Sequence, residues 1–215
     1  MRMTANTSIK LAFHIPTSKV IHIDNADNGK ACKCECLKCK EKLIAVQGDI
    51  RDEHFRHNTN IICNGSQETA LHLLGKQILL ENNQITIPKW GTINYSDASI
   101  EKKFDSTRPD VTAIYNEQNI YFEIAVKHFI EKDKENFFTT GQHKCVEIDL
   151  SDADTTSYEK IKNLVLCQTS NKKIFGWKEL LKHTDDNWFE KIVIFALIGT
   201  LIVSFSNWLS SKRRH

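Results

Sequence analysis

Three carboxylates, Glu68, Asp110 and Glu123, are of a type and spacing that could bind a metal ion together. Asp110 lies in R-P-D-V-T-A and Glu123 in I-Y-F-E-I-A-V-K, and short β-like runs follow or surround these two acids. Acidic side chains that meet at the end of a sheet are costly unless a cation neutralises them. The three residues therefore predict a cation site.

A second group of candidate metal ligands consists of cysteine and histidine side chains. A two-residue spacing between cysteines lets a tight turn present both thiolates to one ion, and thiolate and imidazole suit Zn²⁺ in a closed tetrahedral shell. His54 is a substitute for the predicted histidine ligand, and Cys32 and Cys34 offer alternative thiols. The alternative for the whole group is a set of reduced surface thiols. The best four ligands are Cys36, Cys39, His57 and Cys63.

Composition limits the class of protein but does not indicate what the protein binds. A chain of 215 residues can hold one sizeable domain, or a medium domain with a small appendage. The 29 Lys and Arg residues nearly balance the 27 Asp and Glu residues, so nucleic-acid binding must be argued from local sites. Seven cysteines, four of them crowded between residues 32 and 39, favour metal ligation in a reducing compartment. No secretory signal is visible at the N-terminus.

The elements that must position these residues follow from the apolar pattern. Residues 8–24 alternate as a β-hairpin, and a strong helix follows the turn at 64–66. On that helix Glu68, His72 and Lys76 form one polar stripe. The order of elements predicts an α/β core with a mixed sheet. The remaining expected elements are strands near Ile85, from Val111, from Ile120 and at Cys145–Leu150, a tight turn at Asn116–Asn119, and helices near 129–138 and 155–165.

The C-terminal segment differs from the rest of the chain. An uncharged apolar run from Ile192 to Leu209, with Trp188 and Trp208 near its ends, predicts a single transmembrane helix. A buried core helix or an oligomerisation helix is the alternative. The expected localisation is the cell inner membrane, with the large domain in the cytoplasm. The expected organisation is a hairpin and zinc module at 1–63, a catalytic domain at 64–167, a connector at 168–190 and the membrane helix at 191–210.

Several motifs together resemble the competence protein CoiA-like family of the PD-(D/E)xK nuclease superfamily. They are C-L-K-C-K-E-K-L-I-A-V-Q-G, H-F-R-H, C-N-G-S-Q-E-T-A-L-H-L-L-G-K, R-P-D-V-T-A, Y-F-E-I-A-V-K-H-F-I-E-K-D-K and C-V-E-I-D-L, within residues 30–152. The resemblance implies a mixed central sheet flanked by helices, behind a zinc-ribbon-like module, acting on DNA. Asp110 matches the motif aspartate, Glu123 the acid on the next strand, and Glu68 the acid on the preceding helix.

The resemblance also implies how the site would work. Asp110, Glu123 and the backbone carbonyl of Ile124 would bind Mg²⁺ or Mn²⁺, with Glu68 acting directly or through water. The sequence departs from the family motif at one position. The motif has a lysine two residues after the second acid, but here that position, two residues after Glu123, is Ala125. The two replacements for that lysine, which the sequence leaves open, are Lys127 and Lys76.

The expected function is that of a membrane-anchored, metal-dependent DNA nuclease that hydrolyses phosphodiester bonds, acting on incoming foreign DNA in defence or DNA uptake. The alternative is a degenerate nuclease fold that binds DNA or a protein partner at the membrane without cutting. Self-association is a further expected partnership. A zinc-dependent hydrolase is disfavoured, because four protein ligands leave no open coordination position on the ion.

Overall fold

The computed structural model describes residues 8–48, 52–61, 63, 67–100, 103–105 and 107–177. Within these ranges the chain is a mixed α/β protein with three α-helices, as the sequence predicts. They are α1 (Gln67–Glu81), α2 (Lys132–Thr140) and α3 (Tyr158–Leu166). No helix in the described ranges is long and apolar enough to span a bilayer. The expected membrane helix at 191–210 and most of the expected connector lie outside these ranges.

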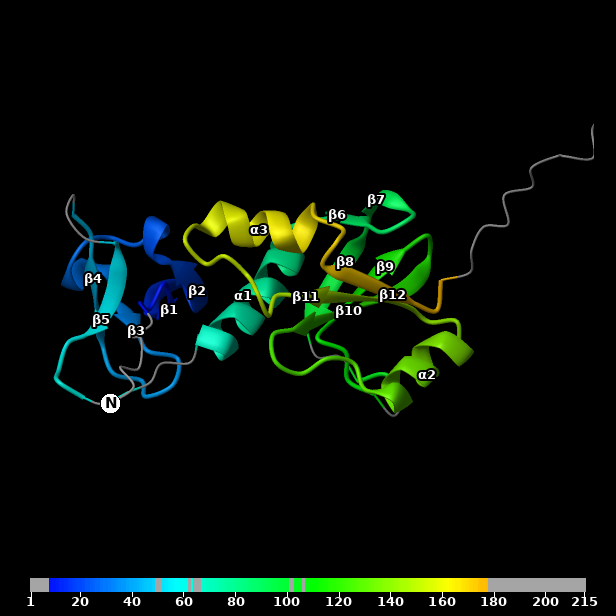
Figure 1. Ribbon diagram of the computed structural model, residues 1–215, viewed down its shortest axis with the longest axis horizontal. Coiled ribbons are helices and arrows are strands. Elements are labelled where there is room, and N and C mark those ends of the chain that lie inside the picture. Colours follow the sequence, from blue (N-terminus) through cyan, green and yellow to red (C-terminus); the bar gives the residue numbers. More distant parts are fainter. Residues whose placement is uncertain are drawn as a thin grey trace, which may run out of the picture. The chain divides into compact units, whose positions relative to one another are not determined.

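A five-stranded mixed sheet, in the order β12-β11-β10-β9-β8, carries the predicted carboxylates (Figure 1). Strands β8, β9 and β10 are antiparallel neighbours, β11 runs parallel to β10, and β12 is antiparallel to β11. Parallel neighbours require a crossover connection, which α2 supplies between β10 and β11. The strands are β8 (Ser96–Ile100), β9 (Val111–Tyr115), β10 (Gln118–Ala125), β11 (Lys144–Asp149) and β12 (Lys172–Phe175).

A tight turn sets the register between β9 and β10. Asn116 and Glu117 both have positive φ, at 49° and 61°, as the two central residues of a type I′ hairpin turn require. The predicted turn is thus confirmed in its first two residues, and its last two already belong to β10. The register pairs Val111 with Phe122, so Asp110 lies one position beyond this pair, beside Glu123 on the neighbouring strand.

Helix α1 packs closely on the face of the sheet that it shares with α3 (Figure 1). Its apolar side contributes Leu71, Leu74 and Ile78 to the largest core cluster. At Gly75 a Cβ atom would lie only 3.1 Å from Cγ2 of Ile124 on β10, so a glycine permits this close approach. The approach brings the polar residues on either side of Gly75 to the ends of β9 and β10.

Helix α2 covers the opposite face of the sheet (Figure 1). Phe138 of α2 packs against Tyr121 of β10 and Cys145 of β11 in a separate buried cluster. Because side chains alternate along a strand, Glu123 shares the face of Tyr121. Glu123 therefore lies on the side of the sheet that α2 covers.

The N-terminal module, residues 8–63, is built from short strands around a small core of its own. The predicted hairpin is confirmed, with Leu11 of β1 opposite His22 of β2. The module also contacts α1, where the Val20 amide donates to Oε1 of Gln77 at 3.0 Å. Its strands are β1 (Leu11–His14), β2 (Lys19–His22), β3 (Cys34–Glu35), β4 (Leu43–Val46) and β5 (His54–His57).

Two parts of the described chain extend what the sequence predicts. A hairpin of β6 (Gln84–Ile87) and β7 (Gly91–Asn94) follows α1. The sequence predicts only the first strand of this hairpin, near Ile85. Strand β12 falls inside the stretch expected to be a connector. It is held in place by the buried Lys172, whose Nζ donates to the carbonyls of Leu164 and Gln168 at the end of α3. The sheet therefore continues almost to Trp177.

Candidate functional site

Asp110, directly before β9, is held by groups from α1 and β10. Its Oδ2 accepts a hydrogen bond from the backbone amide of Ile124 on β10 at 2.9 Å. The same oxygen lies 3.0 Å from Nε2 of His72 on α1, and Oδ1 lies 3.4 Å from Nζ of Lys76. An ionised carboxylate can only accept, so Nε2 of His72 carries the hydrogen of this bond. Helix α1 and strand β10 thus fix the orientation of Asp110.

The electrostatic surroundings keep Asp110 ionised. Burial raises its pKa, but hydrogen bonds from His72 and the Ile124 amide, together with the charge of Lys76, outweigh that effect. The net result is a pKa below the usual range of an aspartate. Asp110 is therefore a charged carboxylate at neutral pH.

Glu123 is the most buried of the three predicted acids and has a lysine partner of its own. Its side chain is 11% exposed, and its Oε1 lies 2.7 Å from Nζ of Lys134 on α2. Burial raises the pKa of Glu123 to about 7, although Lys134 lowers it, and the charge of Asp110 adds a smaller upward effect. The ionised form of Glu123 is thus costly in this buried position.

Glu68, at the start of α1, pairs with Lys127 in the loop after β10. The distance between Oε2 of Glu68 and Nζ of Lys127 is 2.5 Å, and the lysine side chain is 67% exposed. An ion pair this accessible to water contributes little to stability. Either side chain can therefore turn toward a ligand at small cost.

Each predicted carboxylate is thus paired with a different lysine in the described part of the chain. Lys76 and Lys127, the two predicted lysines, contact Asp110 and Glu68, and Lys134 contacts Glu123. Among the described residues the three acids do not gather their oxygens around one point as the cysteine and histidine group does. A cation that binds between Asp110 and Glu123 must replace part of this lysine pairing.

Two residues at this site are absent from the sequence predictions. Lys134 is one, and Glu147 on β11 is the other: it is the register neighbour of Glu123, is 2% exposed, and accepts the backbone amide of Ile130 at 2.5 Å. A charged residue inside the apolar run C-V-E-I-D-L is the signal that could have identified Glu147. Glu147 fixes the loop that leads into α2 and Lys134.

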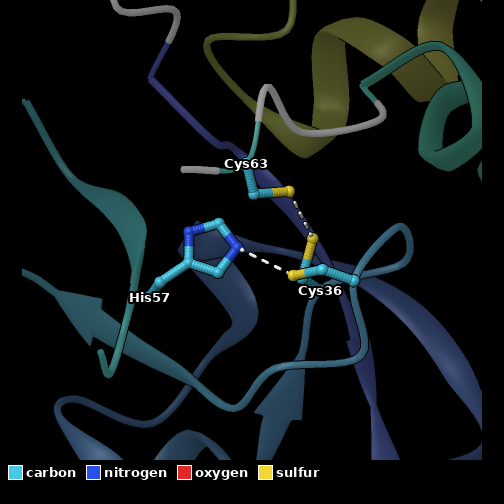
Figure 2. A group of neighbouring side chains, drawn as sticks. Cys36, His57 and Cys63 are labelled. Carbon is cyan, nitrogen blue, oxygen red and sulfur yellow. Dashed lines mark hydrogen bonds between the residues drawn. The ribbon is translucent and has the colours of Figure 1, made fainter. Parts of the chain in front are cut away.

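The four predicted zinc ligands come together in the N-terminal module. The ligand atoms of Cys36, Cys39, His57 and Cys63 all lie within 4.8 Å of one another. Figure 2 shows Cys36, His57 and Cys63 pointing toward one another from separate segments of the chain. The Sγ atoms of Cys36 and Cys63 are 3.9 Å apart, and Sγ of Cys39 is 3.3 Å from Nε2 of His57. Tetrahedral Zn²⁺ with Zn–S distances of about 2.3 Å places two thiolates about 3.8 Å apart, so the spacing fits.

The neighbouring candidates are occupied in other ways. Sγ of Cys32 donates to the Leu43 carbonyl at 3.4 Å, and Sγ of Cys34 donates to the Cys32 carbonyl at 3.0 Å. Burial raises the pKa of Cys34 to about 12, so it remains a thiol. Nδ1 of His54 contacts the Asp52 carbonyl at 2.8 Å. Cys36, Cys39, His57 and Cys63 therefore form the cluster, whereas the alternatives Cys32, Cys34 and His54 contact backbone carbonyls instead.

The chemistry of the clustered donors suits a metal. Desolvation raises the pKa of Cys39 to about 11, and hydrogen bonding with Cys36 and Cys63 adds to this effect, although a backbone hydrogen bond involving Glu41 lowers the pKa. Crowded thiols resist ionisation until a cation is present, and a bound metal deprotonates them. The Cys₃His group could thus hold a metal ion such as zinc.

Comparisons with known proteins add no assignment to this geometry. No protein-family model matches the chain, and searches of curated proteins and of solved structures find no significant match.

Proposed function

We propose that the chain is a metal-dependent DNA nuclease of the CoiA-like, PD-(D/E)xK type, with Asp110, Glu123 and Lys134 at its active site. One observation carries the proposal. Asp110 directly precedes β9, one position beyond the Val111–Phe122 pair and so next to the buried Glu123 of β10, and Nζ of Lys134 on α2 is 2.7 Å from Oε1 of Glu123. The mixed central sheet with helices on both faces supports the same proposal.

The proposed roles follow from the surroundings of each residue. Asp110, Glu123 and the carbonyl of Ile124 would bind Mg²⁺ or Mn²⁺, with Glu68 near the entrance. When bound, such a cation lowers the pKa of a water molecule and stabilises the leaving oxygen of a phosphodiester. Asp110 supplies a fixed negative charge, because its orientation is set by the Ile124 amide and by His72. Positions set before the substrate arrives avoid a reorganisation cost during the reaction.

Lys134 is the best candidate for the motif lysine that is missing at Ala125. Ala125 shares a face of β10 with Glu123, and α2 covers this same face, so a lysine on α2 can occupy the same region. The Lys134 side chain is 29% exposed and directly contacts Glu123. Lys127 instead points to Glu68, and Lys76 approaches Asp110 from α1. Lys134 would thus stabilise negative charge on the phosphate.

The lysine assignment predicts unequal effects of two matched substitutions. Lys134→Met should reduce single-turnover cleavage by about a hundredfold or more, as expected for loss of one preorganised charge at a transition state. Lys127→Met removes an exposed lysine of the same site and should reduce cleavage only a few-fold. Rapid-quench assays with labelled DNA, alongside circular dichroism, measure both. A greater loss in Lys127→Met would assign the role to Lys127 instead.

The nuclease proposal itself is tested with the full-length protein in detergent. We expect Mg²⁺ or Mn²⁺ to support degradation of linear, circular or single-stranded DNA, and EDTA or Asp110→Asn to prevent it. Asparagine retains the shape and one acceptor oxygen of Asp110 but not its charge, so the fold should remain. Intact DNA with every divalent ion tested would reject catalysis.

A second candidate function, DNA binding without cleavage, is favoured by one observation. The three acids are each neutralised by a lysine, and the motif position at Ala125 carries no lysine at all. Under this alternative the lysine pairs are permanent and no metal enters. DNA that shifts in a gel yet stays intact, with no rise in thermal midpoint on adding Mg²⁺, supports this alternative.

The remaining proposals concern the other parts of the chain. Zn²⁺ in the Cys₃His group would be structural, because its four protein ligands leave no open position. The apolar sequence at 191–210 would tether the protein to the inner membrane with the nuclease in the cytoplasm. Tethering would confine cleavage to DNA at the cell envelope, such as incoming foreign DNA. Fractionation of cells expressing the full chain and a variant lacking 188–215 tests this localisation.

A further inference from the structure

An exposed aromatic ring stands beside the proposed active site. Phe129, in the loop between β10 and α2, is 42% exposed, and it is the one aromatic among the exposed large apolar side chains of the described residues. Nζ of Lys173, on the edge strand β12, lies 5.5 Å from the centre of its ring. The ring thus combines an accessible face with a neighbouring positive charge.

A row of residues across the sheet relates this ring to the proposed metal ligands. Glu123 on β10 is in register with Glu147 on β11, and Glu147 is in register with Lys173 on β12. Neighbouring strands are about 4.8 Å apart, so the backbones of Glu123 and Lys173 are separated by about 10 Å. Measured along a DNA strand, Phe129 therefore lies within a few nucleotides of a phosphate bound at Glu123.

The buried Glu147 fixes the backbone next to Phe129. Its carboxylate accepts the amide of Ile130, the residue that follows Phe129, and its other oxygen lies 3.7 Å from Nζ of Lys173. The carboxylate thus fixes the backbone of the loop that carries the ring, whereas the Lys173 side chain is 69% exposed and only weakly held. A ring whose backbone is fixed in this way needs little reordering when a planar group stacks on it.

The charges around the ring favour stacking over simple electrostatic attraction. Lys127, His128 and Lys132 are exposed in the same segment, but so are Glu131 and Asp133. The excess of positive charge is therefore small, in line with the net charge of +2 for the whole chain. Stacking of bases on aromatic side chains does not depend on a large charge, and every base has a face suited to it.

We propose that Phe129, supported by Lys173, is a stacking platform for an unpaired base, so that the site takes single-stranded DNA or single-stranded DNA ends. Bases in a duplex already stack on one another, and presenting one to the ring requires unstacking and unpairing it. An unpaired strand presents its bases without that cost. The position of the platform relative to cleavage rests on the proposed nuclease function, whereas its base stacking does not.

The test measures binding with the full-length protein in detergent, at one fixed salt concentration and without added Mg²⁺ or Mn²⁺, so that the proposed zinc site keeps its ion and cleavage does not contribute. Fluorescence anisotropy would compare a labelled single strand with the duplex of the same sequence. Phe129→Ala should weaken single-strand binding about 5- to 150-fold and duplex binding less than twofold. Phe129→Trp should retain single-strand affinity, and Phe129→Leu should lose it as alanine does.

Ile100→Ala is the matched control, because Ile100 is another exposed apolar residue and lies on the opposite edge strand, β8. Two results for Phe129→Ala would contradict the proposed stacking platform: an unchanged affinity for the single strand, or an equal loss of affinity for the single strand and the duplex. If Phe129→Leu kept the wild-type affinity for the single strand, base stacking would not be the mechanism of binding at this position. Phe129-dependent binding by a wild-type protein that cuts no DNA in Mg²⁺ would reject the nuclease and keep the platform.

Discussion

Glu123→Gln is expected to abolish metal-dependent DNA cleavage and, in the same variant, to increase the free energy of unfolding at pH 8 of the protein without added Mg²⁺ or Mn²⁺. The activity is lost because the amide removes one of the two charged oxygen ligands of the proposed metal site. Loss of several kcal/mol of transition-state stabilisation corresponds to about a thousandfold or more in rate. The gain in stability has a separate cause, the cost of an ionised carboxylate in a buried position.

The sign of the pH dependence follows from the direction of the pKa shift. Burial raises the pKa of Glu123 from 4.5 to about 7, so the folded state binds a proton more tightly than the unfolded state. The stability that this protonation contributes is present below pH 4.5 and is lost as the pH rises through 7. The loss is about 3 kcal/mol at most. Glutamine does not titrate, so the variant should be about 1–3 kcal/mol more stable than the wild type at pH 8 and similar at pH 4 to 5.

Urea unfolding at pH 5 and pH 8, without added Mg²⁺ or Mn²⁺, measures this difference, with Glu135→Gln, an exposed acid on α2, as the matched control. Mg²⁺ should raise the thermal midpoint of the wild type but not that of Glu123→Gln, because only a ligand that binds the folded state stabilises it. Cleavage by the variant at the wild-type rate would remove Glu123 from the metal site. A stability difference that is the same at both pH values would show that burial of the charge is not its cause.

The pairing of Asp110 with Glu123 could be predicted from the sequence because it depends on local structure. The alternating apolar residues of β9 and β10 and the Asn116–Glu117 turn make these strands a hairpin, and hairpin partners are neighbours in a sheet. The Cys36 and Cys39 pair is likewise predictable, since two ligands with two residues between them share one turn.

Lys134 could not be predicted because its position depends on how α2 lies on the sheet. Phe138 is the buried residue of α2, and Lys134 precedes it by four positions, so the two share a face of the helix. The sequence offers Phe137 and Phe138 equally as the residue that faces the sheet, and the choice between them decides which lysine reaches Glu123. Strand β12 was missed for a related reason, because four residues at a sheet edge give too short a pattern.

Cys63→Ser is expected to reduce bound zinc from about one ion per chain to nearly none and to lower the thermal midpoint by about 10 °C or more. Structural zinc sites contribute about 10–16 kcal/mol of apparent binding free energy, as much as the whole stability of a typical domain. The small core around Ala12, Ile23 and Phe55 has few other sources of stability. A loss of about 3 kcal/mol already lowers the midpoint of a chain of this size by roughly 10 °C.

Substitutions at the nearest alternative ligands provide controls for the metal content. His57→Ala should lose zinc, whereas His54→Ala should retain it, because Nδ1 of His54 contacts the Asp52 carbonyl instead of the cluster. Cys34→Ser should also retain zinc, since its hydroxyl can still donate to the Cys32 carbonyl. Elemental analysis of the purified full-length proteins measures all four. Zinc loss in His54→Ala, or a wild-type protein without bound metal, would contradict the assigned set.

The effect of zinc loss should extend beyond the module, because Cys63 lies four residues before the start of α1. The module also contacts this helix through the 2.8 Å ion pair between Lys19 and Glu81. Helix α1 carries Glu68 and the His72 that orients Asp110. Releasing Cys63 should therefore increase hydrogen exchange in the first turns of α1 as well as in the module. Exchange that rises in the module alone, with α1 as protected as in the wild type, would show that the metal stabilises its own module without supporting the carboxylate site.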